Sequence, residues 1–161
     1  SPNMICDSVL DIQLEEYYNQ GFRTILLDID NTIIDLKSKQ VSMEYAKWIE
    51  KAKKQGFRIY IISNSFKWIR IRRVAKQLDL TGLYFSIKPL PFSARIIANK
   101  HPIKMQETLV IGDQVLTDVI FGNWLGSYTI LVEPVDPNLT IIKTCQKHIE
   151  TALLRWIGIQ T

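Results

Sequence analysis

Cysteine and histidine are scarce in this sequence of 161 residues, with two of each. Cys6 and Cys145 lie far apart, and neither belongs to a Cys-x-x-Cys pair. A disulfide framework and a structural zinc site are therefore not indicated. We expect reduced thiols and a cytoplasmic protein.

Long apolar runs are also missing. The runs at 24–27 and 59–62 are far shorter than the roughly 20 residues that a membrane-spanning helix needs, and they predict buried strands. No low-complexity tract or internal repeat is present, so neither a disordered chain nor a flexible linker is indicated. No secretory signal is visible, although the chain begins with Ser1 and a removed leader stays open.

What the chain does contain is enough apolar material for one core. Hydrophobic residues make up 47% of the sequence, which predicts a single domain over residues 1–161. The formal net charge is +4, and this modest excess favours phosphate-bearing partners without requiring them.

Apolar runs alternate with helical patterns along the chain, which predicts parallel strands joined by crossover helices. The fold class is therefore α/β: a Rossmann-like, three-layer α/β/α arrangement with a five-stranded, mainly parallel sheet covered on both faces. Strands are expected at about 23–28, 57–63, 83–86, 108–112 and 127–132.

Helices are expected between these strands. The first, around 11–20, would end at Gly21, and the second, around 43–55, would follow Ser42 as N-cap and stop at Gly56. A third, at about 67–79, has an apolar stripe and leaves Arg70, Arg72, Arg73 and Lys76 on its polar face. A last helix would begin near Asp136 and pack on the domain.

Polar residues follow four of the apolar runs. Because the carboxyl ends of parallel strands form the ligand crevice, these clusters are the candidate site. They are Asp28-Ile29-Asp30-Asn31-Thr32, Ser63-Asn64-Ser65, Lys88-Pro89, and Gly112-Asp113 with Asp118.

Two carboxylates on one loop suggest a metal and a reaction. Asp28 and Asp30 would repel each other at the mouth of the sheet unless a cation lay between them, and oxygen ligands favour Mg²⁺. Asp113 would complete a metal site made of these three acids. One of the paired carboxylates could then attack a phosphate monoester while the other moves the proton, with the Ser63 hydroxyl and the Lys88 ammonium stabilising the phosphoryl oxygens.

Each cluster alone has an ordinary structural explanation as a turn, a helix cap or an exposed lysine. These explanations do not account for the occurrence of all four clusters together, each after its own strand.

As a set, the clusters resemble the four motifs of the haloacid dehalogenase superfamily of phosphatases over residues 23–133. The resemblance implies a magnesium-dependent phosphatase that works through an aspartyl-phosphate. It also implies these roles: Asp28 as nucleophile, Asp30 as acid/base, Ser63 and Asn64 as phosphate ligands, Lys88 as the neutralising lysine, Asp113 and Asp118 as metal-site acids, and Thr32 as a brace.

A closer likeness is to the YqeG family, in subfamily IIIA, which is similar to phosphatidylglycerophosphate phosphatases. It rests on the runs at 28–32, 88–91, 111–119 and 128–132 and extends upstream to 7–12. One departure is Trp124, which stands where that family usually has arginine.

The loops around the site are short, so no cap domain is expected. An open site suits a bulky substrate whose own mass covers the reaction centre. We expect a phosphomonoester such as a phospholipid at the bilayer surface, met by the basic helix at 67–79, with nucleic acid not expected as a partner because aromatic and basic residues do not interleave on the strands. A nucleic-acid phosphate and a phosphorylated protein stay alternative substrates.

Two further readings belong to other classes of protein. A signalling receiver domain also has an acidic cluster and a lysine, but it places its phosphoacceptor aspartate after the third strand, where this chain has Lys88. A phosphatase-like scaffold with little activity is the stronger alternative, because the sequence cannot separate a slow site from a fast one.

Overall fold

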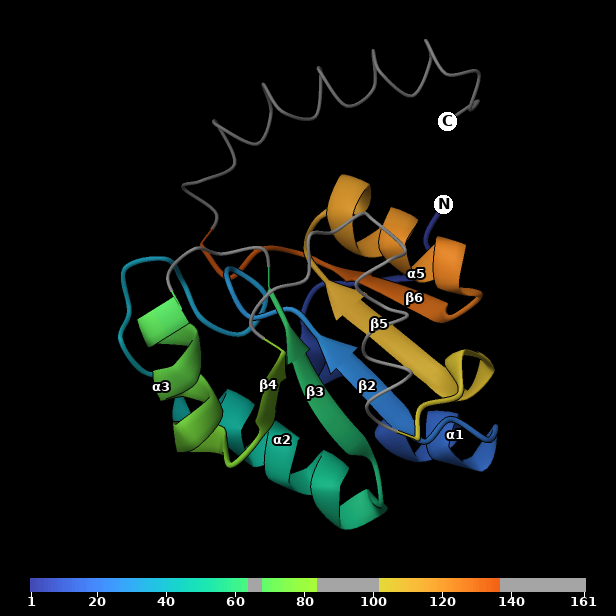
Figure 1. Ribbon diagram of the computed structural model, residues 1–161, viewed down its shortest axis with the longest axis horizontal. Helices are drawn as coiled ribbons and strands as arrows, with labels where there is room; N and C mark the ends of the chain where they lie inside the picture. The colour runs from blue at the N-terminus through green and yellow to red at the C-terminus, as the bar shows by residue number, and fades with distance from the viewer. Residues whose placement is uncertain (64–67, 84–101, 137–161) are drawn as a thin grey trace, which may run out of the picture.

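The computed structural model describes residues 1–63, 68–83 and 102–136, and the elements below belong to those ranges. Six strands form one sheet in the order β1-β6-β5-β2-β3-β4, and every neighbouring pair is parallel. The strands are β1 (Met4–Cys6), β2 (Thr24–Leu27), β3 (Arg58–Ile62), β4 (Thr81–Leu83), β5 (Thr108–Gly112) and β6 (Tyr128–Val132) (Figure 1).

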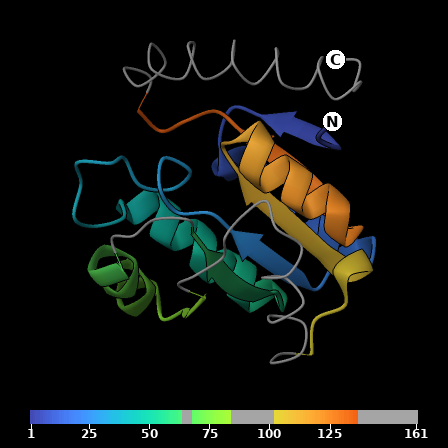
Figure 2. The same cartoon turned by 45° about the horizontal axis from the view of Figure 1, so that its top comes forward.

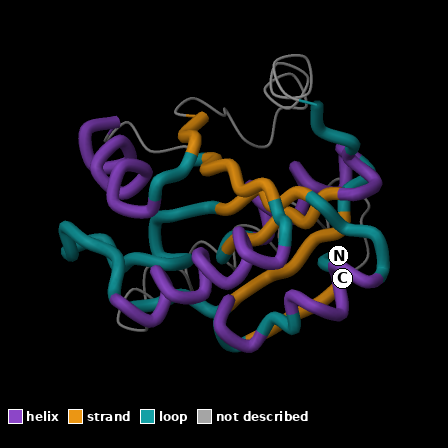
Figure 3. Tube along the Cα trace, turned by 90° about the horizontal axis from the view of Figure 1, so that it is seen from below, coloured by secondary structure: helices purple, strands orange, loops and turns teal. Residues whose placement is uncertain are grey.

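Helices cover the sheet on both faces, as the buried strands predicted (Figures 2 and 3). On one face α2 (Met43–Gln55) and α3 (Trp68–Leu78) share a core cluster with alternate strand residues, whereas α5 (Ile120–Leu125) contributes Phe121 to a second cluster on the other face. All four residues of β2 are buried. The Rossmann-like α/β/α class is therefore confirmed.

Two predicted helices keep their bounds. The helix α2 follows Ser42 and ends at Gly56, whose φ of 107° is the left-handed cap conformation, although the Ser42 side chain makes no capping hydrogen bond. In α3 the apolar stripe is buried at Ile71 and Val74, where both side chains are fully enclosed.

The first predicted helix is shorter than expected. The chain makes a 3-10 turn, η1 (Val9–Asp11), before α1 begins (Leu14–Asn19), because the Ser8 hydroxyl accepts the amide of Leu10 at 3.2 Å and caps that turn separately.

One strand was missed from the sequence. The edge strand β1 has three residues and pairs with β6, and three residues are too few to show an apolar period. The expected strand at 83–86 overlaps β4 at Leu83, and its remaining residues, like the helix expected from residue 137 onward, lie outside the described residues.

The order of the strands places a crevice beside β2. From β2 the chain moves through β3 to β4 on one side, while β5 and β6 lie on the other side, so the connections reverse direction at the carboxyl end of β2. That reversal is where ligands bind in open parallel sheets. Between Asp30 and α2 the chain forms no further helix or strand apart from a single bridge between Asp30 and Ile34, so no cap domain lies in that described segment.

Candidate active site

The register of the sheet brings two of the predicted clusters together. Leu27 pairs with Ile111 between β2 and β5, and the amide of Asp28 donates to the carbonyl of Ile111 at 2.9 Å. The residues that follow, Asp28 on one strand and Asp113 on the other, therefore leave the sheet side by side.

Three carboxylates gather at this point. Side-chain oxygens of Asp28, Asp113 and Asp118 all lie within 4.8 Å of one another, and the three residues are 6%, 9% and 2% exposed. Buried carboxylates at such distances repel each other unless a cation or protons compensate them. An all-oxygen, acidic set of this kind fits a divalent metal ion.

Gly112 allows Asp118 to join this cluster. A Cβ at position 112 would lie 2.2 Å from Oδ2 of Asp118, far inside contact distance, so only glycine leaves room for that carboxylate. The amide of Gln114 also donates to Asp118 Oδ2 at 3.1 Å. The end of β5 and the turn after it are thus shaped around Asp118.

Thr32 lies between two of the acids. Its Oγ1 is 3.3 Å from Asp28 Oδ2 and 3.5 Å from Asp113 Oδ1, and the residue is 1% exposed. The hydroxyl has one proton and so can donate to one of the two carboxylates at a time. The bracing role of Thr32 stays a prediction.

The loop after β2 is shaped by Asn31. Its φ is 68°, a left-handed conformation that asparagine tolerates better than most residues. Its carbonyl accepts the amide of Val135 at 2.8 Å, and its Oδ1 accepts the amide of Asp136 at 3.1 Å. The segment that follows β6 is therefore hydrogen-bonded to the predicted catalytic loop.

The side chain of Asp30 has different neighbours from the side chain of Asp28. Its side chain is not part of the acidic cluster, and its Oδ1 lies 3.1 Å from Nε of Arg70 in an ion pair. The predicted metal set of Asp28, Asp30 and Asp113 is thus represented among the described side chains by Asp28 and Asp113, with Asp118 as the third carboxylate.

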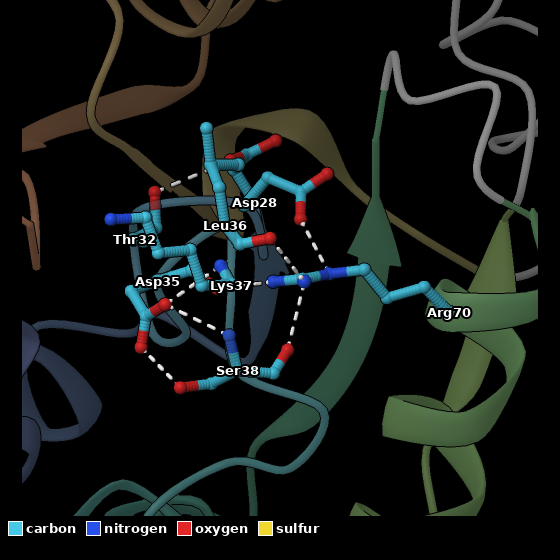
Figure 4. Close-up of polar contacts among 8 residues, drawn as sticks. Asp28, Thr32, Asp35, Leu36, Lys37, Ser38 and Arg70 are labelled. Carbon is cyan, nitrogen blue, oxygen red and sulfur yellow. Dashed lines mark hydrogen bonds and ion pairs between the residues drawn. The ribbon is translucent and has the colours of Figure 1, made fainter. Parts of the chain in front are cut away.

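Arg70 is the site residue that the sequence pattern placed wrongly. Helical periodicity assigns it to the exposed face of α3 with Arg72 and Arg73, and those two are exposed, but the Arg70 side chain is only 14% exposed. Its guanidinium extends from the first turn of α3 toward the turn at residues 35–38 (Figure 4). The useful signal was position, because α3 starts five residues after Ser63, at the carboxyl end of β3.

Of the predicted phosphate ligands, Ser63 directly follows β3 and is 2% exposed, next to the strand that carries Asp28. Asn64 and Lys88 lie outside the described residues. The site as described combines a buried acidic cluster, a buried hydroxyl and a second, arginine-paired aspartate, all after neighbouring strands.

Comparison with known proteins agrees with this arrangement. The profile of the family described as Mitochondrial PGP phosphatase matches residues 3–80, and a HAD-hydrolase-like profile matches residues 87–134. The sequence is 28% identical over 153 residues to Probable phosphatase YqeG of Bacillus subtilis, covering 95% of this chain and 88% of that protein.

Along most of its length, the chain is therefore similar to phosphatases and hydrolases of the HAD type.

Two further proteins widen the comparison. Phosphatidylglycerophosphate phosphatase 1 of Arabidopsis thaliana is 24% identical over 166 residues, which cover 97% of this chain but only 48% of that protein. A predicted HAD-like hydrolase of Porphyromonas gingivalis shares the fold with a TM-score of 0.59 at 13% identity, covering 78% of this chain and 98% of that one. Among the described residues no helix is long and apolar enough to cross a membrane.

Proposed function

We propose that the protein is a Mg²⁺-dependent phosphomonoester hydrolase that works through a phosphoryl group carried by Asp28. The observation that supports this most is the position of Asp28 at the carboxyl end of β2, within 4.8 Å of two other carboxylates and 3.3 Å from the Thr32 hydroxyl. A buried aspartate without a catalytic or metal-binding role would not require two further carboxylates and a hydroxyl beside it.

In the first half of the reaction, an oxygen of Asp28 attacks phosphorus. The new O–P bond forms as the bond between phosphorus and the alcohol oxygen breaks, and Asp30 gives its proton to that oxygen. In the second half, Asp30 as carboxylate takes a proton from a water molecule, which attacks phosphorus and releases inorganic phosphate from Asp28. One loop thus supplies the nucleophile and the acid/base.

The acidic residues fit Mg²⁺. Asp28 and Asp113 would hold it, with Asp118 beside them, and a contribution from Asp30 stays a prediction. When bound, Mg²⁺ would neutralise the carboxylates and the phosphate oxygens. Ser63, together with the predicted Asn64 and Lys88, would donate to the oxygens of the phosphoryl group.

The proposed substrate is a bulky phosphomonoester such as phosphatidylglycerophosphate. This rests on the likeness to the Arabidopsis protein of that name and on the absence of a cap between Asp30 and α2 within the described residues. We propose that Arg72 and Arg73 on the exposed face of α3 meet anionic headgroups, and that the protein is cytoplasmic and peripheral at the membrane. Trp124, the one departure from the resembled family noted above, is 59% exposed and carries no positive charge.

The nucleophile is tested with p-nitrophenyl phosphate and Mg²⁺. We expect turnover by the wild type and a loss of about a thousandfold or more in Asp28→Asn, because an amide is a far poorer nucleophile. Asp79→Asn is the matched control, since that side chain is fully exposed after α3. Undiminished activity of Asp28→Asn would refute the mechanism, and an inactive wild type would favour the scaffold alternative.

The substrate class is tested with a panel of phosphatidylglycerophosphate in micelles, phosphorylated oligonucleotides, phosphopeptides and sugar phosphates. Binding to phosphatidylglycerol vesicles should weaken when Arg72 and Arg73 are replaced by Glu, while the same charge change at the exposed Lys51 and Lys54 of α2 should have less effect. Equal weakening by both pairs would reject α3 as the membrane-facing surface. Preference for an oligonucleotide or a peptide would reject the lipid substrate.

A further inference from the structure

The contact between Arg70 and Asp30 involves two atoms that are shielded from solvent. Arg70 Nε and Asp30 Oδ1 lie 3.1 Å apart, and neither has a hydrogen-bond partner within the described residues. A buried charge without a partner is costly, so each group depends on the other. The ion pair is also the one side-chain interaction found for Asp30 in the described part of the chain.

The remainder of the guanidinium is fixed by main-chain oxygens. Nη1 donates to the carbonyls of Leu36 and Ser38 at 2.9 and 2.8 Å, and Nη2 donates to the carbonyl of Asp35 (Figure 4). These hydrogen bonds use three of the five N–H groups of arginine, while Nε forms the ion pair with Asp30 and makes no hydrogen bond within the described residues. The planar guanidinium is thus oriented by contacts that do not involve Asp30, and its Nε is presented to Asp30 at a set position.

The turn at residues 35–38, which orients Arg70, is stabilised by hydrogen bonds of its own. The Asp35 carboxylate accepts the amides of Lys37 and Ser38 at 2.7 and 2.8 Å, and it also accepts the Ser38 hydroxyl. A second link joins the following segment to α3, because the side-chain amide of Gln77 makes two 2.9 Å hydrogen bonds with the backbone of Val41.

We propose that Arg70 is a positioning residue for the proton transfers of Asp30. This rests on the acid/base role proposed for Asp30 above. By holding Oδ1, the guanidinium leaves Oδ2 as the oxygen that gives its proton to the leaving alcohol and later takes one from water. Arg70 stays charged and exchanges no proton itself.

A role in binding the substrate phosphate is disfavoured by the same contacts. Three of the five N–H groups of Arg70 donate to main-chain carbonyls, and Nε is shielded from solvent in the ion pair with Asp30, so one N–H group of Nη2 is left for a ligand. Arg72 and Arg73 on the same helix are exposed and carry no such commitments among the described contacts, so they are the better candidates for external anions.

The experiment compares two substrates that differ in their leaving group. An alkyl phosphate releases a strongly basic alkoxide and needs the proton from Asp30, whereas p-nitrophenyl phosphate releases a stable phenolate and does not. The ratio kcat/KM covers steps only up to loss of the leaving group and so isolates the first proton transfer. We expect Arg70→Ala to lower kcat/KM by about a hundredfold for the alkyl phosphate and by less than about tenfold for p-nitrophenyl phosphate.

Two matched variants separate positioning from loop anchoring. Gln77→Ala removes a second link between α3 and the same segment without touching Asp30, and Arg58→Ala removes an exposed arginine at the start of β3, away from the site. Both should affect the two substrates equally. Adding guanidinium ion to Arg70→Ala should restore part of the activity toward the alkyl phosphate, while Arg70→Lys, which cannot reach all four acceptors, should stay impaired.

Equal losses on both substrates in Arg70→Ala would overturn the proposal, and so would no loss on either. A raised KM with unchanged dependence on the leaving group would instead assign Arg70 to substrate binding. These outcomes require a wild type whose activity depends on Asp28. An inactive wild type would mean that the proposed function has failed, and the role of Arg70 with it.

Discussion

Asp28 and Asp30 lie two residues apart on one loop, yet their neighbours have opposite charge. Asp28 belongs to a group of three carboxylates with Asp113 and Asp118, whereas Asp30 is paired with the guanidinium of Arg70. The three carboxylates that include Asp28 require a cation from outside the protein to compensate their charge. The charge of Asp30 is already compensated by a cation of the chain itself, the Arg70 guanidinium.

The difference follows from the order of the strands. On the β5 side of β2, the neighbouring strand ends in Gly112-Asp113 and its next turn returns Asp118 to the same point. On the β3 side, the neighbouring strand leads into α3, whose first turn carries Arg70. Two identical residue types therefore acquire separate roles because they face different neighbours of one central strand.

After the loss of Asp28 itself, removing an acid from the β5 side should have the largest effect. We expect Asp113→Asn to lower kcat/KM by about a hundredfold or more and to raise the Mg²⁺ concentration needed for half-maximal activity, since a bound metal stabilises the transition state by several kcal/mol. A titration with Mg²⁺ checks this. Glu133→Gln, an exposed acid just after β6, is the control. An unchanged Mg²⁺ requirement in Asp113→Asn would contradict the proposed metal site.

Gly112→Ala tests how the same side is packed. The new methyl group would lie 2.2 Å from Asp118 Oδ2 and should displace that carboxylate. We expect Mg²⁺ affinity to fall about tenfold, as for other groups that orient a metal ligand, and unfolding free energy to fall by about 1–3 kcal/mol. Thermal unfolding and Mg²⁺ titration measure both effects.

Gly126→Ala provides the comparison. Gly126 has a φ of 68° with open space around it, so alanine there should cost stability through backbone strain and leave the Mg²⁺ requirement unchanged. If both alanine variants shift the Mg²⁺ requirement equally, the contact between Gly112 and Asp118 does not govern the site.

The smallest effect is expected on the Arg70 side, at Asp35. Hydrogen bonds from the Ser38 hydroxyl and the amides of Lys37 and Ser38, with a minor contribution from the charge of Arg70, lower the pKa of Asp35 below its ordinary value. Since the folded-state pKa is depressed, ionised Asp35 stabilises the fold above a pH of about 4, and that contribution is lost as pH falls through the folded-state pKa.

Thermal unfolding as a function of pH checks this expectation. The wild type should exceed Asp35→Asn in Tm near neutral pH, and the gap should narrow on acidification. Ser38→Ala, which removes the donor with the largest influence, should reproduce part of the difference. A gap that is constant with pH would mean that the charge of Asp35 is irrelevant to the turn.

The strands and the acidic cluster were predictable because each depends on a local pattern. Buried apolar runs mark the strands, and parallel strands bring their carboxyl ends to one edge, so the proximity of Asp28 and Asp113 followed from the sequence alone. The likeness to a known superfamily added Asp118, which the described structure places in the same cluster.

The role of Arg70 was not predictable in that way. Its partners are the carbonyls of residues 35, 36 and 38, and every residue type has a carbonyl, so no sequence pattern marks them. Helical periodicity assigns Arg70 to the solvent side, where a long side chain can still bend back over the helix start. The strand β1 escaped detection for a simpler reason, its length of three residues.

The division of labour between the two aspartates is tested most directly by locating the phosphoryl group. In Asp30→Asn, p-nitrophenyl phosphate should still phosphorylate the enzyme because its leaving group needs no proton, while hydrolysis of the intermediate should slow because no base activates water. The protein is quenched in acid, treated with borohydride and digested, and the modified residue is identified by mass spectrometry. The account predicts modification at Asp28, and a modification at another residue, or none while turnover continues, would contradict it.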